Sequence, residues 1–94
     1  MYAVGAVGVI SVLANAYPTT FRKMTTAAAQ SHFAKATKAA FSLLDINGPM
    51  YEEGNPVGIK VLLAELGICQ PHVRLPLTVA TPGLRGKIKT LMIK

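Results

Sequence analysis

Cysteine is nearly absent from this sequence, since Cys69 is the single example among 94 residues. A disulfide framework needs at least two cysteines, so the class of small secreted proteins held together by internal disulfides is excluded. One unpaired cysteine is compatible with a reducing compartment. We interpret Cys69 as a small hydrophobic residue of the fold.

Acidic residues are also scarce, with four Asp and Glu against ten Lys and Arg. Glu52 and Glu53 are adjacent, and neighbouring side chains on an extended segment point in opposite directions. We therefore expect no catalytic carboxylate pair there and interpret the two residues as part of a solvated loop. His32 and His72 lie far apart in sequence, and we expect neither a metal site nor a cofactor.

The net charge of +6 raises the possibility of a nucleic-acid partner or an acidic membrane surface. The basic residues are scattered, however, and cluster only in the tail from residue 85 to residue 94. No aromatic residue lies in that tail to stack on bases. We expect no nucleic-acid partner, and we keep a basic nucleic-acid-binding helical protein only as a third hypothesis.

The sequence has no hydrophobic run long enough to cross a membrane. A spanning helix needs about 20 apolar residues, and the apolar stretch over 2–17 is shorter and is interrupted by Gly5, Gly8 and Asn15. The positively charged start of a secretory signal is missing as well. These absences predict a soluble cytoplasmic protein without a membrane partner. Neither a GxGxxG nor a GxxxxGK pattern occurs, so nucleotide binding is not expected.

The most informative stretch that is present is GVISVLAN, residues 8–15. It is apolar almost throughout, and Val9, Ile10 and Val12 are β-branched, which favours a pleated strand. A continuous apolar run without alternation is typical of a parallel strand covered on both faces. No second strand of similar quality follows, so we expect its sheet partners to lie outside these 94 residues.

The remainder of the sequence predicts a mostly α-helical chain. One helix is expected from Pro18 to residue 30, and a second from a cap at Ser31 to about residue 47. A third follows Asn55 as its cap, with Pro56 in its first turn, and Gly67 ends it. A connector with three prolines over 68–83 leads into a last helix capped by Thr81.

The third predicted helix, residues 56–66, is apolar nearly all round, so we expect it to be buried or to face a partner. Gly58 lowers its helix propensity by up to about 1 kcal/mol relative to alanine unless close packing requires a glycine. Lys60 lies on this helix, and no apolar pocket is evident that would lower its pKa. We therefore interpret Lys60 as a surface lysine and not as a Schiff-base nucleophile.

Five segments, in order, carry a resemblance to a known family. They are GAVGVISVLANAYP (5–18), SHFAKA (31–36), GNPVGIK (54–60), ELGI (65–68) and VRLPLT (73–78). The chain resembles the carboxyl-terminal third of the 4-hydroxy-tetrahydrodipicolinate synthase (dihydrodipicolinate synthase) family, part of the pyruvate-dependent aldolases that include N-acetylneuraminate lyase. Gly58 stands where the family pattern most often has a proline, which bears only on local packing.

The resemblance implies an α/β fold in which the chain is the carboxyl-terminal piece of a (β/α)8 barrel plus a helical appendage. Residues 1–30 are then the last strand and helix of the barrel, and residues 31–94 a carboxyl-terminal helical domain. Family members condense pyruvate with aspartate semialdehyde in lysine biosynthesis, through a Schiff base on a lysine of the sixth strand. Ile10 matches the eighth-strand isoleucine that packs against pyruvate, at the end of the barrel where such sites lie.

The family's Schiff-base lysine and proton-relay residues match no position in this chain, so no catalytic residue is expected here and the chain alone is expected to be inactive. Its expected partners are the rest of the barrel, pyruvate and aspartate semialdehyde in the full-length enzyme, and further copies in a homo-oligomer. The alternative is a non-catalytic helical interaction module of the same family that packs through the helix at 56–66. The sequence leaves open whether the chain is a fragment, a broken gene or a complementing subunit.

Overall fold

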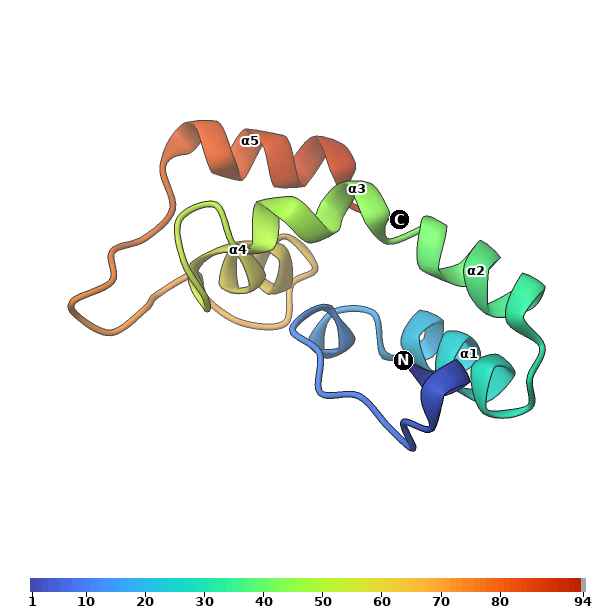
Figure 1. Cartoon of the computed structure of the whole chain (residues 1–94). Coiled ribbons are helices and arrows are strands. Elements are labelled where there is room, and N and C mark those ends of the chain that lie inside the picture. The colour runs from blue at the N-terminus through green and yellow to red at the C-terminus, as the bar shows by residue number, and fades with distance from the viewer. Residues whose placement is uncertain (94) are drawn as a thin grey trace. The chain divides into compact units, whose positions relative to one another are not determined.

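The computed structural model describes residues 1–93 and divides them into two compact units (Figure 1). The first unit is Met1–Leu44 and the second begins at Asp45. The α-helices are α1 (Pro18–Ala29), α2 (Phe33–Phe41), α3 (Leu44–Asn47), α4 (Val57–Glu65) and α5 (Pro82–Leu91). Three short 3-10 helices are η1 (Tyr2–Val4), η2 (Leu13–Asn15) and η3 (Gly48–Met50). The expected boundary after residue 30 concerns the assembled barrel and stays a prediction.

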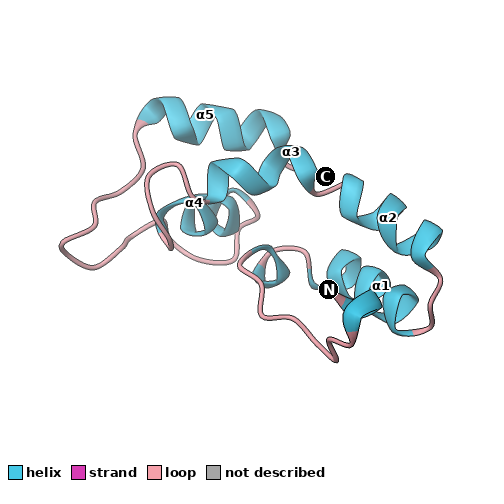
Figure 2. Cartoon of the chain, viewed as in Figure 1, coloured by secondary structure: helices cyan, strands magenta, loops and turns pink. Residues whose placement is uncertain are grey.

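The predicted strand over residues 8–15 does not form, and within residues 1–93 no strand is present (Figure 2). Residues 6–12 have no helix or strand, and the chain then coils into η2, where the Asn15 amide donates to the Val12 carbonyl at 3.0 Å. The prediction of a mostly α-helical chain is confirmed for the described residues, whereas the prediction of a strand over residues 8–15 was wrong for these residues taken alone. The physical reason is that a strand is stabilised by hydrogen bonds to a neighbouring strand, and the described residues provide none.

In the first unit, α1 packs against α2. Pro18 lies in the first turn of α1, as the sequence predicted, because its missing N–H is not needed there. Ala27 on α1 and Ala36 on α2 are both buried, and their small side chains permit close approach of the two helices. The cap of α2 was predicted wrongly: Ser31 adopts a positive φ of 61° in the connecting turn, and His32 is the N-cap residue.

In the second unit, α4 is the central element and packs against η3 and α5. The predicted burial of this apolar helix is confirmed, with Val57, Gly58, Ile59, Val61 and Leu62 all buried. Pro56, and not the expected Asn55, is the N-cap residue. The expected helix end at Gly67 is confirmed, since Gly67 has φ +75° and its N–H donates to the Ala64 carbonyl at 2.9 Å.

Gly58 allows α4 to lie directly against η3. A Cβ atom at this position would be 2.6 Å from the Cα of Met50 and 2.7 Å from the carbonyl oxygen of Pro49. Neither atom can move without shifting the main chain. Close packing therefore requires this glycine, which explains its presence in an apolar helix.

The last helix begins as the sequence predicted. Thr81 is the N-cap of α5, and its hydroxyl accepts a hydrogen bond from the Leu84 N–H at 3.3 Å. Leu84 and Ile88 lie on one helical face and are buried, at 4% and 0% exposure. The helix thereby closes the core of the second unit over α4 and η3.

Candidate functional site

Ile10, the one residue to which the sequence analysis assigned a substrate contact, is fully exposed in this structure. It lies in the segment over residues 6–12 that has no regular structure. Its neighbour Val9 is half-exposed and lines an apolar cavity, whereas Ile10 does not line that cavity. Successive side chains therefore lie on different sides of the segment, with Val9 toward the helices and Ile10 away from them.

The cavity beside this segment lies within the first unit and has a volume of about 330 Å³. It is lined mainly by apolar groups from the amino-terminal residues, α1 and α2. Those lining residues are Met1, Tyr2, Ala3, Val9, Met24, Thr25, Ala28, Phe33, Ala36, Thr37 and Ala40. Because the lining carries no charged side chain, the cavity is suited to an apolar covering segment and not to a polar reaction.

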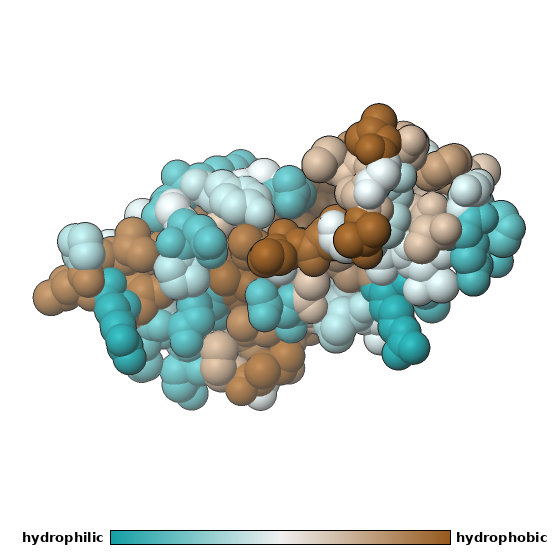
Figure 3. All heavy atoms as spheres, turned by 60° about the horizontal axis from the view of Figure 1, so that its bottom comes forward, coloured by the Kyte–Doolittle hydropathy of each residue, from teal (hydrophilic) through white to brown (hydrophobic). Residues whose placement is uncertain are grey.

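Brown apolar atoms reach the surface in several places in Figure 3, and exposed large apolar residues are more numerous in the first unit. Its exposed large apolar residues are Met1, Val4, Val7, Val9, Ile10, Phe33, Phe41 and Leu44. Five of these eight residues belong to the first ten residues of the chain, so much of this apolar exposure accompanies the segment without regular structure.

Lys60 and the metal-ligating residue types were the remaining candidates for a reactive site. Lys60 is only partly exposed on α4, and it does not line the apolar cavity of the first unit. Among residues 1–93, no group of three His, Cys, Asp or Glu side chains could hold a metal ion. No helix among the same residues is long and apolar enough to span a bilayer.

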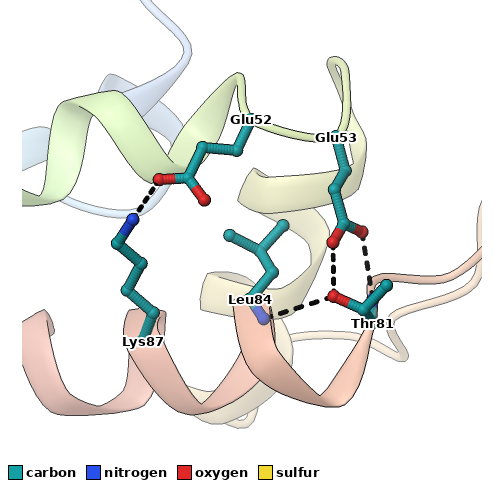
Figure 4. A network of polar contacts seen from close by, with 5 residues as sticks. All are labelled: Glu52, Glu53, Thr81, Leu84 and Lys87. Atoms are coloured by element: carbon teal, nitrogen blue, oxygen red, sulfur yellow. Dashed lines mark hydrogen bonds and ion pairs between the residues drawn. The ribbon is translucent and has the colours of Figure 1, made fainter.

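Glu52 and Glu53 lie in a turn where Glu52 is exposed, as the interpretation of a solvated loop expected, and both carboxylates also bind α5 (Figure 4). Glu53 accepts hydrogen bonds from the Thr81 hydroxyl and from the Thr81 backbone N–H, the latter at 3.0 Å. Glu52 forms an ion pair with Lys87, which lies further along α5 than Thr81. The sequence carried no signal for these contacts, because the partners are 28 and 35 residues apart.

Hydrogen bonding changes the acidity of Glu53. The Thr81 hydroxyl and then the Thr81 N–H donate to the charged carboxylate and hold its pKa below the ordinary value. The Thr81 hydroxyl thus accepts from Leu84 as a helix cap while it donates to Glu53. The residues before α4 and the first turn of α5 are joined through one side chain.

A further ionic contact joins α4 to α5. The Glu65 carboxylate accepts a hydrogen bond from the Arg85 Nε at 2.9 Å, and the Lys89 Nζ lies 3.9 Å from its other oxygen. The Glu65 side chain is only 14% exposed, so two cations stabilise a largely desolvated anion. These contacts are structural and leave the charged groups of the second unit largely paired.

Comparison with known proteins assigns the family. The model of the Dihydrodipicolinate synthetase family matches residues 1–93. The chain belongs to this family. Within it, the chain is 50% identical over 92 residues to the 4-hydroxy-tetrahydrodipicolinate synthase of Cytophaga hutchinsonii and 39% identical over 92 residues to that of Syntrophotalea carbinolica. Each alignment covers 98% of this chain and 31% of the relative.

Solved structures of the same family agree. A crystal structure of dihydrodipicolinate synthase matches with a TM-score of 0.90 and 31% identity, and the enzyme from Aquifex aeolicus matches with a TM-score of 0.90 and 33% identity. Both matches cover 96% of this chain and 31% of the solved chain, which is a (β/α)8 barrel. The chain therefore spans about a third of the length of the dihydrodipicolinate synthases that it matches.

Family membership confirms the resemblance inferred from the five sequence segments. It does not test the role of Ile10, which stays a prediction, and the structure adds only that this side chain points away from the packed helices. What sequence reasoning missed is the polar network of the second unit. That network joins α5 to α4 and to the turn before α4.

Proposed function

We propose that this chain is the carboxyl-terminal third of a lyase that condenses pyruvate with aspartate semialdehyde through a lysine Schiff base, in cytoplasmic lysine biosynthesis. In this proposal residues 8–15 enter the barrel wall as its eighth strand and α1 is the last barrel helix. The later helices form the carboxyl-terminal appendage. The proposal rests chiefly on the 50% identity to a named synthase over 98% of this chain.

The exposed segment over residues 6–12 supports this placement. It presents Val9 toward the first unit's helices and Ile10 away from them, which is the two-sided character of a barrel strand. Its backbone lacks a neighbouring strand among residues 1–93. Insertion between the first and seventh strands of a barrel would satisfy these backbone groups and cover Ile10 at the same time.

Ile10 is proposed to pack against pyruvate at the carboxyl end of the barrel. An isoleucine has no titratable or hydrogen-bonding group, so its contribution is the shape of the pocket and the exclusion of water. The nucleophilic lysine, the proton-relay residues and the group that binds the semialdehyde are proposed to come from the preceding part of the enzyme. We propose that the 94-residue chain alone is inactive and that the complete enzyme assembles as a homo-oligomer.

No contact favours the alternative of a non-catalytic module that docks through residues 56–66. Most apolar residues of α4 are buried within the second unit by η3 and α5, which leaves little apolar surface on this helix for docking. Exposed large apolar side chains are more numerous in the first unit, where we propose that a barrel would cover them.

Borohydride trapping tests the proposal. The 94-residue chain is incubated with pyruvate and borohydride, alone and fused after the first two-thirds of the Cytophaga hutchinsonii synthase, and adducts are located by peptide mass spectrometry. We expect an adduct in the fusion, on a lysine of the supplied part, and none in the chain alone. A specific adduct on Lys60 or another lysine of this chain would refute the absence of the nucleophile.

The role of Ile10 is tested in the same fusion. Ile10→Ala is expected to raise the KM for pyruvate, because the pocket loses apolar contact and admits water. Leu75→Ala is the matched control, since Leu75 is also exposed but lies in the connector before α5. Equal effects of the two substitutions, or no effect of Ile10→Ala, would remove Ile10 from the site.

A further inference from the structure

The first unit carries a one-sided charge. No Asp or Glu occurs between Met1 and Leu44, whereas Arg22, Lys23, Lys35 and Lys38 are all exposed there. In the second unit the carboxylates of Glu52 and Glu65 form ion pairs with lysine and arginine side chains of α5. The first unit itself therefore supplies no carboxylate to pair with its four cations, and their mutual repulsion is screened by salt.

These four cations gather on one feature, an open groove of about 830 Å³ between α1 and α2. Its lining contains no carboxylate. The lining residues are Thr19, Thr20, Arg22, Lys23, Thr26, Ala27, Gln30, His32, Lys35, Lys38, Ala39 and Ser42. Two cations come from each helix, so a molecule in the groove would meet positive charge from both walls.

Hydrogen-bond donors add to this charge. Thr19, Thr20 and Thr26 contribute hydroxyl groups along the α1 wall. No side-chain cap bonds the N–H groups of the first turn of α1, where Thr19 and Thr20 lie, and this helix end carries partial positive charge. The groove volume falls within the range of small-molecule sites.

We propose that this groove binds a small polyvalent phosphate compound, an oligophosphate or a phosphate ester with at least two phosphate groups. Phosphate oxygens take several donors at once and are matched by Arg, Lys and hydroxyl side chains. The site is separate from the segment over residues 6–12, because none of those residues lines it. It is also independent of the proposed reaction, whose substrates are carboxylates.

The lining favours a compact phosphate over a nucleic-acid strand or an acidic peptide. Apart from the imidazole of His32 it contains no aromatic ring, so bases have no stacking platform. Only Ala27 and Ala39 are wholly apolar among the lining residues, and the remaining apolar surface comes from the aliphatic parts of polar side chains, so a peptide would find no large apolar side chain to pack against. The feature that distinguishes this groove is four cationic side chains with no carboxylate among the lining residues.

Titration calorimetry on the complete 94-residue chain tests the proposal, with inorganic tripolyphosphate as the probe. We expect saturable binding with one site per chain, which weakens as salt is raised because exposed ion pairs are screened. Poly-glutamate peptide and single-stranded DNA of equal charge are titrated in parallel. Tighter binding of either polymer than of tripolyphosphate, or no saturable binding of tripolyphosphate at low salt, overturns the proposal.

Charge-neutral variants locate the site. Lys35→Gln and Lys38→Gln are each expected to weaken tripolyphosphate binding about two- to fivefold, the effect of one exposed charge pair. Arg74→Gln removes one positive charge from the second unit and is the matched control, since Arg74 is exposed and lies outside the groove. Circular dichroism verifies that each variant keeps its helices. If Arg74→Gln weakens tripolyphosphate binding as much as the groove variants do, binding depends only on net charge, and the assignment of the site to this groove is overturned.

Discussion

The same substitution, glycine to alanine, is expected to have opposite effects at two helical positions of the second unit. Gly58 on α4 is buried, and an added Cβ would be 2.6 Å from the Cα of Met50. Gly86 on α5 is exposed, and an added Cβ would meet nothing within 4 Å. Both glycines lie within helices, so the change in helix propensity favours alanine at each.

The magnitudes follow from packing. At Gly58 the new methyl group lies more than half an ångström inside normal contact with main-chain atoms, and overpacking of this kind costs about 1–3 kcal/mol. Helix propensity offsets at most about 1 kcal/mol of that cost. At Gly86 only the gain remains, because alanine restricts the unfolded chain, and it amounts to about 0.4–1 kcal/mol.

Thermal unfolding followed by circular dichroism measures both changes. With a shift of about 4–8 °C per kcal/mol for a chain of this size, Gly58→Ala is expected to lower the Tm and Gly86→Ala to raise it. The two variants should differ by about 10 °C. If both substitutions raise the Tm, α4 moves freely away from η3, and the account of Gly58 as a required close contact is refuted.

Three further outcomes are expected in the same chain. Thr81→Ala is expected to lower the unfolding free energy measured by urea titration by about 1 kcal/mol, because the cap of α5 is lost. Thr81→Ser keeps a capping hydroxyl and is expected to retain most of that free energy. Glu53 has a lowered pKa in the folded state, so its contribution to stability is present above the ordinary glutamate pKa and is lost as pH falls through the lowered value. Tm measured from neutral to acidic pH should therefore fall less steeply in Glu53→Gln, and an identical pH profile would count against the hydrogen bonds to Thr81. Ile10→Asp is expected to change the unfolding free energy by less than about 0.5 kcal/mol, because this side chain is exposed. Leu62→Ala, at a fully buried position, should lower the unfolding free energy by about 2–5 kcal/mol. A large loss of stability in Ile10→Asp would show that this segment is packed in the isolated chain.

Local signals in the sequence located most helices correctly. Pro18 in a first turn, Thr81 as a cap and Gly67 as a helix end act through bonds within a few residues, so they can be identified without knowing the fold. The errors were also local: Ser31 and Asn55 are good cap residues by type, yet His32 and Pro56 occupy the cap positions. A difference of one residue depends on how the following helix packs.

The sequence by itself determined the family and the apolar character of residues 8–15 and of α4, because side-chain chemistry and its order are carried along the chain. Only the tertiary structure decided what those segments contact. The strand did not form, since its hydrogen bonds require backbone that the described residues do not provide. The pairs that join Glu53 to Thr81 and Glu52 to Lys87, and the four cations that meet across the α1–α2 groove, arise from contacts between separate elements. Such contacts depend on how the elements pack, and no spacing in the sequence encodes them directly.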